Sequence, residues 1–314
     1  MTLLHLTALA AAIAAAPVPG GDTRPETLGK FDMSYPAPSP DGTAILFQGN
    51  FDGRWQLYLM RAADGSVRRL HVSSRDDTHP AWSPDGTKVA FISNRGGDDD
   101  VYILDVATGN VRPLSPHPGK DGHPKWSRDG EWILFNRTFD PNDKGGDGDS
   151  AILKVRGEGG RPETISDTPR VETFASLSPD GRSLALVEWF PGAGGERNRN
   201  GEIMLVDVAT GARRNLTNSE AFDGHPAWDS SGRWIYFSSV VEGPGGREMA
   251  VHRIRPSGDG LERLTAIDGT SEVRAVPSDD GRWLYFNASG SGRTLIHRQR
   301  LEPAAVPASR GALP

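Results

Sequence analysis

The sequence predicts an all-β fold, a six-bladed β-propeller with four antiparallel strands in each blade. Two observations support this prediction. Glycine and proline account for 38 and 24 of the 314 residues, which breaks long helices but stays below the share typical of structureless chains. In addition, an eight-residue motif recurs every 44 to 51 residues, a period that is typical of propeller blades.

The repeated motif is clearest from His79 to Gly86, which reads His-Pro-Ala-Trp-Ser-Pro-Asp-Gly. Close copies occupy residues 123–130 and 225–232, and weaker copies occupy residues 35–42, 174–181 and 274–281. The Ser-Pro-Asp-Gly step is a tight turn, because proline presets φ and glycine accepts a positive φ. Each copy closes on a glycine, and six closing glycines predict six blades: Gly42, Gly86, Gly130, Gly181, Gly232 and Gly281.

Each repeat contains the further strands of a blade. A short β-rich run follows every closing glycine, and a large apolar residue stands five positions after it. Third strands are expected at residues 55–60, 101–105, 152–155, 203–207, 251–254 and 295–298. The sixth repeat lacks a fourth strand, and residues 23–28 resemble the fourth strand at 160–165. We therefore expect the N-terminal strand to complete the last blade and to close the ring, which removes an open sheet edge.

The predicted propeller extends over residues 22–301, between two terminal segments. Residues 1–16 form an uncharged apolar run that ends in small residues. It is too short to span a bilayer as a helix, and it is typical of a secretory signal peptide; a frayed N-terminal helix is the alternative. Residues 302–314 are rich in alanine and proline and are expected to be a disordered tail. These features predict a periplasmic or secreted monomer without a membrane span.

Charge and cysteine content exclude several classes of function. The chain has 35 basic and 41 acidic residues, a net charge of −6, and no cysteine. A chain without a basic excess is not expected to bind nucleic acid. The lack of cysteine excludes disulfides, Cys-ligated zinc and thiol nucleophiles.

The candidate site is a ring of residues that begins the innermost strand of every blade, where the strands line the central channel. Seven residues before the closing glycines stand Tyr35, His79, His123, Phe174, His225 and Arg274. Nine residues before the glycines, five of the six repeats carry an acid: Asp77, Asp121, Glu172, Asp223 and Glu272. Both sets are expected at one mouth of the channel, on the face opposite the Ser-Pro-Asp-Gly turns. Long loops at residues 138–149, 190–200 and 240–247 are expected to surround that mouth.

The ring allows two interpretations. In the first, His79, His123 and His225 bind a divalent metal, with the acids as ligands or as their hydrogen-bond partners. In the second, the rings pack between blades and each acid bonds backbone N–H groups of the incoming loop. Arg274 is also suited to binding an anion. The acidic loop at 140–149 suggests calcium as one option and a solvated loop as the other.

The His-Pro-x-Trp-Ser-Pro-Asp-Gly motif, followed by Val-Ala-Phe-x-Ser-Asn-Arg at residues 89–95, resembles the repeat of TolB-type β-propellers. The resemblance extends over roughly residues 23–300 and implies a bacterial envelope location. TolB carries an additional α/β domain before its propeller, which is not expected here. The repeat is also similar to the propellers of prolyl oligopeptidases, whose hydrolase domain and Gly-x-Ser-x-Gly motif have no counterpart here, and of seven-bladed, metal-dependent oligogalacturonate lyases.

These observations predict an exported, non-enzymatic propeller without a cofactor, which binds a protein segment or a small ligand of the cell envelope at the ring. The alternative is a metal-dependent lyase or hydrolase that acts on acidic saccharides and uses the His residues of the ring.

Overall fold

The computed structural model describes residues 26–28, 32–139, 150–192, 195–243, 246–267, 269–290 and 292–301. Every element within these ranges is a β-strand. The predicted signal peptide at 1–16, the acidic loop at 140–149 and the tail at 302–314 lie outside the described residues.

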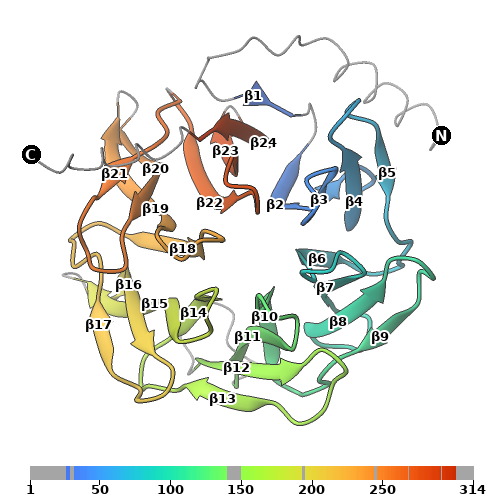
Figure 1. Cartoon of the computed structure of the whole chain (residues 1–314), viewed down its shortest axis with the longest axis horizontal. Helices are drawn as coiled ribbons and strands as arrows, with labels where there is room; N and C mark the ends of the chain where they lie inside the picture. Colours follow the sequence, from blue (N-terminus) through green and yellow to red (C-terminus); the bar gives the residue numbers. More distant parts are fainter. Residues whose placement is uncertain are drawn as a thin grey trace, which may run out of the picture.

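The strands form six four-stranded antiparallel sheets arranged around a central axis, which confirms the predicted six-bladed propeller (Figure 1). Blade one consists of β2 (Met33–Pro38), β3 (Ala44–Asn50), β4 (Trp55–Arg61) and β5 (Val67–Arg69). Blade two consists of β6 (Asp77–Trp82), β7 (Lys88–Ser93), β8 (Asp100–Asp105) and β9 (Val111–Pro113). Blade three consists of β10 (Lys120–Trp126), β11 (Trp132–Thr138), β12 (Ser150–Arg156) and β13 (Glu163–Ser166).

The second half of the chain repeats this arrangement. Blade four consists of β14 (Glu172–Leu177), β15 (Ser183–Gly192), β16 (Gly195–Asp207) and β17 (Arg213–Asn215). Blade five consists of β18 (Asp223–Trp228), β19 (Ile235–Gly243), β20 (Gly246–Ile254) and β21 (Glu262–Arg263). Blade six consists of β22 (Ser271–Pro277), β23 (Trp283–Gly290), β24 (Arg293–Arg300) and β1 (Glu26–Thr27).

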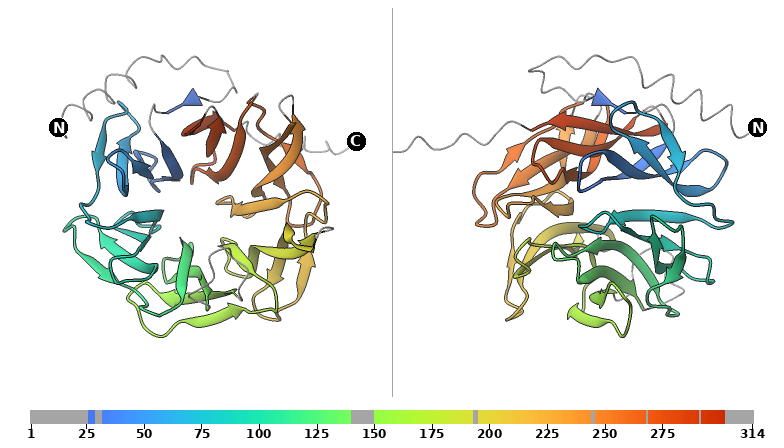
Figure 2. Two further views of the ribbon diagram at one scale, coloured as in Figure 1. Left: turned by 180° about the vertical axis from the view of Figure 1, so that it is seen from behind. Right: turned by 45° about the vertical axis from the view of Figure 1, so that its right-hand side comes forward.

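The N-terminal strand closes the ring as predicted. β1 runs antiparallel to β24, with Glu26 opposite Arg298, and the N–H of Leu28 donates to Ile296 O at 2.8 Å. Figure 2 shows β1 at the outer edge of the last blade in two further views. First and last strands of the propeller therefore belong to one sheet, and the ring is closed by backbone hydrogen bonds.

Two of the predicted long loops are largely strands. β15 and β16 stay paired out to Gly192 and Gly195, and β19 and β20 stay paired out to Gly243 and Gly246. In the hairpin of β19 and β20, the outer pair Glu242 and Arg247 is exposed, so these residues do not need the apolar alternation by which a strand is recognised in a sequence. The sequence predicts loops at 190–200 and 240–247 because both segments are rich in glycine and lack this alternation.

The Ser-Pro-Asp-Gly turns are held by side chains within each turn. In blade two, Ser83 Oγ donates to Asp85 Oδ1 at 2.6 Å, and the same oxygen accepts from the N–H of Thr87 at 3.0 Å. Gly86 has a φ of 69°, a left-handed conformation that glycine adopts without strain. These turns form one face of the propeller, which we call the turn side, and the opposite face is called the loop side.

The core lies between neighbouring blades. Leu46 and Leu57 of blade one pack in a single cluster with Val89 and Phe91 of blade two. The motif tryptophans join these clusters, and Trp82 Nε1 donates to Ala37 O of the preceding blade at 3.1 Å. The tryptophans therefore pack between blades.

Candidate functional site

Each innermost strand contains a β-bulge at the position of the predicted ring residue. In β6, for example, Thr78 pairs with Ile92 whereas Ala81 pairs with Ala90, which leaves an additional residue on β6. The bulged residues all have a φ between 52° and 58°, and we call them the axial ring: Tyr35, His79, His123, Phe174, His225 and Arg274.

The left-handed conformation of the axial ring is unusual for these residue types. It costs about 1–2 kcal/mol for a residue with a Cβ atom. Four members of the ring also precede a proline, which ordinarily favours an extended backbone. The sequence pattern therefore gave no indication of the bulge, which is held in place by tertiary contacts.

Polar side chains of the neighbouring blade hold several of the bulges. Gln48 Oε1 accepts the N–H of His79 at 2.8 Å, and Asn287 Oδ1 accepts the N–H of Tyr35 at 3.1 Å. Ser238 Oγ accepts the N–H of Arg274 at 3.2 Å. All three acceptors directly follow the large aromatic residue of a second strand. A polar residue that directly follows the large aromatic residue, within an otherwise apolar run, is the signal by which these positioning residues can be found.

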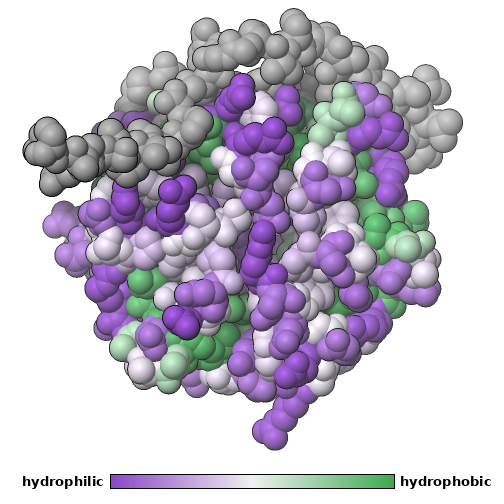
Figure 3. Space-filling model, viewed as in Figure 1, coloured by the Kyte–Doolittle hydropathy of each residue, from purple (hydrophilic) through white to green (hydrophobic). Residues whose placement is uncertain are grey.

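The side chains of the axial ring contact one another on the propeller axis. Ring centroids are 4.1 Å apart for Tyr35 and His79, and 4.6 Å apart for His79 and His123. Phe174 continues this series, with centroids 4.1 Å from His123 and 4.4 Å from His225. In the space-filling view, side chains cover the centre of the ring that the ribbons leave open (Figure 3).

Tyr35 extends across the axis and connects two further members of the axial ring. The guanidinium of Arg274 lies over its aromatic ring, with Cζ 4.2 Å from the centroid. Its hydroxyl lies 3.4 Å from His123 Nε2. The opposite nitrogen of this imidazole, Nδ1, lies 2.9 Å from Asn136 Oδ1. A proton on Nδ1 satisfies Asn136 and leaves Nε2 to accept from the Tyr35 hydroxyl.

The imidazoles of the axial ring are neutral at pH 7. Burial lowers the pKa of His123 to about 4, although its hydrogen bond to Asn136 acts in the opposite direction. Burial also lowers the pKa of His79 and His225 well below the usual value, and the positive charge of Arg274 adds to this effect. Neutral imidazoles leave Arg274 as the one permanent charge among these six residues.

A pocket of about 260 Å³ lies on the axis, between the axial ring and the turn side. All six ring residues line it, together with the motif prolines, the motif tryptophans and the residues of the turns. The sequence predicts a candidate site on the loop side. The pocket lies on the opposite side, because its wall consists of the strand residues that follow the ring toward each turn, such as Pro80, Ala81 and Trp82.

The five predicted acids do not line this pocket. Asp121 is 5 % exposed and forms two hydrogen bonds with Arg137, of 2.6 and 2.9 Å. Asp77 pairs with Arg95 at 2.7 Å. Glu272 accepts the N–H of Ile267 at 2.7 Å. These contacts hold the segments that enter the inner strands, and they direct the carboxylates away from the axis.

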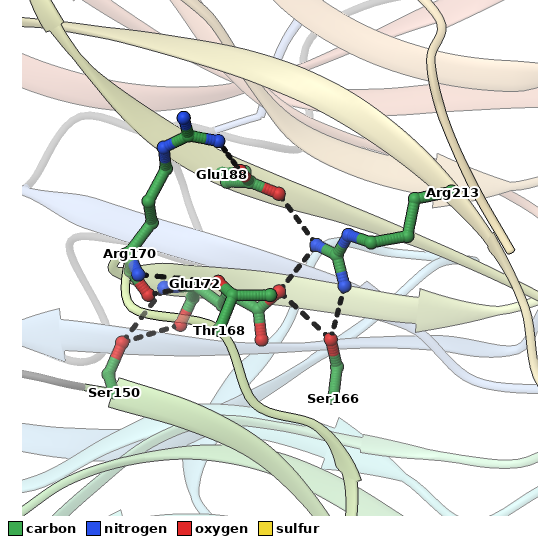
Figure 4. Close-up of polar contacts among 7 residues, drawn as sticks. All are labelled: Ser150, Ser166, Thr168, Arg170, Glu172, Glu188 and Arg213. Carbon is green, nitrogen blue, oxygen red and sulfur yellow. Dashed lines mark hydrogen bonds and ion pairs between the residues drawn. The ribbon is translucent and has the colours of Figure 1, made fainter. Parts of the chain in front are cut away.

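Glu172 shows this arrangement most completely (Figure 4). Arg213 extends from β17 and contacts Glu172 at 2.5 Å and Glu188 at 2.7 Å. Ser166 Oγ donates to the same oxygen of Glu172 at 2.9 Å, and Arg170 contacts Glu188 at 2.6 Å. Burial raises the pKa of Glu172, and Arg213 limits that rise. In blade five, the carboxylate of Asp223 accepts from Ser219 Oγ at 2.8 Å.

The three histidines do not converge on one point. His79 and His123 are in edge-to-face contact, while Phe174 lies between His123 and His225. Within the described residues, no group of three or more His, Asp or Glu residues is arranged to hold a metal ion.

Two charged features of the pocket are not among the site residues predicted from the sequence. Lys125 lines the pocket five residues before the closing glycine of blade three. At the mouth, Arg128 of blade three pairs with Asp279 of blade six, with Nη1 and Oδ1 2.7 Å apart. These blades are opposite in the ring, so the ion pair extends across the mouth. A charged residue where other repeats have small ones is the signal that indicates Lys125.

The comparisons with known proteins agree with the repeat pattern. Residues 22–144 and 79–193, together more than half of the chain, match the model described as the TolB beta propeller domain. An uncharacterized protein of Agrobacterium fabrum is 31% identical over 119 residues, which are 38% of this chain and 36% of that protein. The matched segment therefore extends over about a third of this relative's length.

Solved structures share the architecture at low sequence identity. TolB from Acinetobacter baumannii has a TM-score of 0.58 and 18% identity, over 87% of this chain and 64% of that chain. An oligogalacturonate lyase in complex with manganese has a TM-score of 0.64 and 13% identity, over 88% and 93% of the two chains. At these identities the likeness shows the fold alone. The part of the chain that the structure describes contains no helix long and apolar enough to cross a membrane.

Proposed function

The chain belongs to the TolB beta propeller family, and from this premise we propose that it is an exported, non-enzymatic binding protein that holds its ligand in the axial pocket. The pocket itself carries the proposal. All six blades contribute a left-handed residue to its inner end, so its geometry depends on the whole ring. Strained residues fixed by tertiary contacts are typical of functional sites.

The shape of the pocket favours a small ligand over a protein segment. The contacts within the axial ring block its inner end, and the Arg128–Asp279 pair crosses its mouth. A volume of about 260 Å³ lies just below the usual range for small-molecule sites, which begins at about 300 Å³. A chain segment would have to enter beside the ion pair and turn back within this space.

Filling the pocket tests the proposal. Ala81 lies in the wall of the pocket, so Ala81→Phe fills it. Ala63 is exposed in a turn and does not line the pocket, so Ala63→Phe is the matched control. Purified proteins are incubated with a small-molecule extract of cell envelopes, and retained compounds are identified by mass spectrometry. We expect a compound that is retained by the native chain and by Ala63→Phe and lost from Ala81→Phe. The proposal is refuted when the two variants retain the same compounds.

The competing proposal is a metal-dependent lyase or hydrolase that acts on acidic saccharides. The contact between His79 and His123, with Arg274 beside Tyr35, is the observation that favours it. Metal analysis by native mass spectrometry separates the two proposals. A stoichiometric Mn, Zn or Ca ion that is lost when His79, His123 and His225 are all replaced by alanine would favour the enzyme. A chain that neither retains nor is stabilised by divalent ions contradicts it.

We propose a periplasmic or secreted location and a monomeric state as parts of the same function. Both are measured directly. The N-terminal sequence of protein from the envelope fraction should begin after the apolar segment 1–16, and light scattering should give the mass of one chain. Uncleaved protein in the cytoplasmic fraction would contradict export.

A further inference from the structure

We propose that the axial pocket selects small organic anions, whose acid group is held by Lys125 and Arg274. This inference rests on the proposed function, because it names the chemical class of the ligand in the same pocket. The proposed ligand is a single small molecule with one acid group and an apolar body.

The charges in the pocket are unbalanced. Five charged residues line it: Lys125, Arg128, Asp229, Arg274 and Asp279. Arg128 and Asp279 neutralise each other at the mouth. Asp229 accepts from Ser231 Oγ at 2.5 Å and from the N–H of Trp234 at 3.1 Å, both within its own turn. Among the described residues, neither Lys125 nor Arg274 forms an ion pair with a carboxylate.

The repeat shows that Lys125 is not required by the fold. The corresponding residue is small or apolar in the other five blades: Ala37, Ala81, Ser176, Ala227 and Val276. An ammonium group within a half-buried wall is costly without a partner. Burial lowers the pKa of Lys125, which reflects this cost. An anionic ligand would supply the missing partner.

Arg274 is held in place while part of its hydrogen-bonding capacity remains unused. Its guanidinium lies over the Tyr35 ring, and its Nε atom is buried without a hydrogen-bond partner. His225 Nδ1, in the same ring, also lacks a partner. A planar guanidinium fixed against an aromatic ring is suited to carboxylates and phosphates, which it binds through two N–H groups.

The remaining wall suits an apolar body. Pro80, Trp82, Pro124 and Trp228 line the pocket, and the imidazoles of the ring are neutral. An acid group at the inner end would therefore leave the rest of a small molecule against proline and tryptophan side chains. The volume of about 260 Å³ excludes large polyanions.

Three probes of nearly identical shape test the charge preference: benzoate, benzamide and benzamidinium, which carry a negative, a neutral and a positive group. Binding is measured at low salt by ligand-observed NMR, up to millimolar probe. Lys125→Ala is the informative variant, because three other blades have alanine at this position. Lys88→Met, at a lysine outside the pocket, is the matched control.

We expect benzoate to bind at least tenfold more tightly than benzamide, and benzamidinium not to bind. Lys125→Ala should weaken benzoate at least tenfold and leave benzamide unchanged, while Lys88→Met changes neither. If the native chain binds benzoate and benzamide equally and Ala81→Phe binds neither, the anion preference is overturned, but the pocket remains the binding site. If none of the probes binds, the preference for small organic anions is refuted. If binding persists in Ala81→Phe, the axial pocket is not the site at which the probes bind. Phenyl phosphate, measured in parallel, shows whether the preferred anion is a carboxylate or a phosphate ester.

Discussion

Replacing His123 with phenylalanine should make the propeller more resistant to acid. The unfolded imidazole takes up a proton below about pH 6.5, whereas burial lowers the pKa of folded His123 to about 4. Between these values the unfolded state binds more protons, so stability falls as the pH falls from 6.5 to 4. A difference of about 2.5 pKa units corresponds to about 3 kcal/mol at the acid end. Blade four shows that phenylalanine is accommodated in this conformation, because Phe174 has a φ of 56°.

The variant also loses both hydrogen bonds of the imidazole, between Nδ1 and Asn136 at 2.9 Å and between Nε2 and the Tyr35 hydroxyl at 3.4 Å. This loss should cost about 1 kcal/mol at pH 7, where the titration contributes nothing. His123→Phe is therefore expected to be less stable than the native chain at pH 7 and more stable near pH 4.5. The free energy of unfolding is measured with urea and tryptophan fluorescence at both pH values.

The reciprocal variant Phe174→His adds an imidazole at the same place in the next blade and should steepen the loss of stability in acid. If both variants lose as much stability as the native chain between pH 7 and 4.5, the imidazoles of the axial ring are not held in a neutral, buried state.

Three further predictions concern charged groups. Arg137→Met leaves the Asp121 carboxylate unpaired and should lower the free energy of unfolding in urea by about 3–5 kcal/mol at pH 7. Burial raises the pKa of Asp121 to about 6, so protonation of the carboxylate should reduce this cost near pH 5. A cost below about 1 kcal/mol at pH 7 would contradict the buried pair. Lys125→Ala should stabilise the ligand-free chain by about 1 kcal/mol in thermal unfolding at pH 7. This gain in stability should disappear at alkaline pH, where the ammonium of the native chain is deprotonated. Destabilisation at pH 7 would show that Lys125 has a structural partner. Arg128→Ala removes the exposed ion pair with Asp279 and should change the free energy of unfolding by less than about 1 kcal/mol. In stopped-flow mixing, benzoate should associate with this variant and dissociate from it faster than with the native chain. Unchanged rates would show that the ion pair does not obstruct the mouth.

Much of the fold was predictable because the relevant physics is local. The Ser-Pro-Asp-Gly turn is held by bonds within a few residues, such as that between Ser83 and Asp85. Its recurrence marks the blades directly. The closing strand was recognisable for a similar reason, because the missing fourth strand of the last repeat matched a segment before the first.

The candidate site was predictable only in part. The sequence identified the residues that meet on the axis, but it placed the acids beside them and the site on the loop side. In the structure, Glu172 instead contacts Arg213, which is supplied by the outermost strand of its blade. The partner of a buried carboxylate depends on which side chains the fold brings together, and the spacing of motifs does not encode this.

The sequence by itself determined the number of blades, their closure and the identities of the axial ring, because turn chemistry and strand period repeat along the chain. Tertiary structure alone decided the left-handed bulges, the side on which the pocket lies and the isolation of Lys125 and Arg274 from any described carboxylate. Bulges and charge pairing depend on groups from other blades, such as Gln48 beside His79. Such contacts exist only once the six blades have closed into a ring.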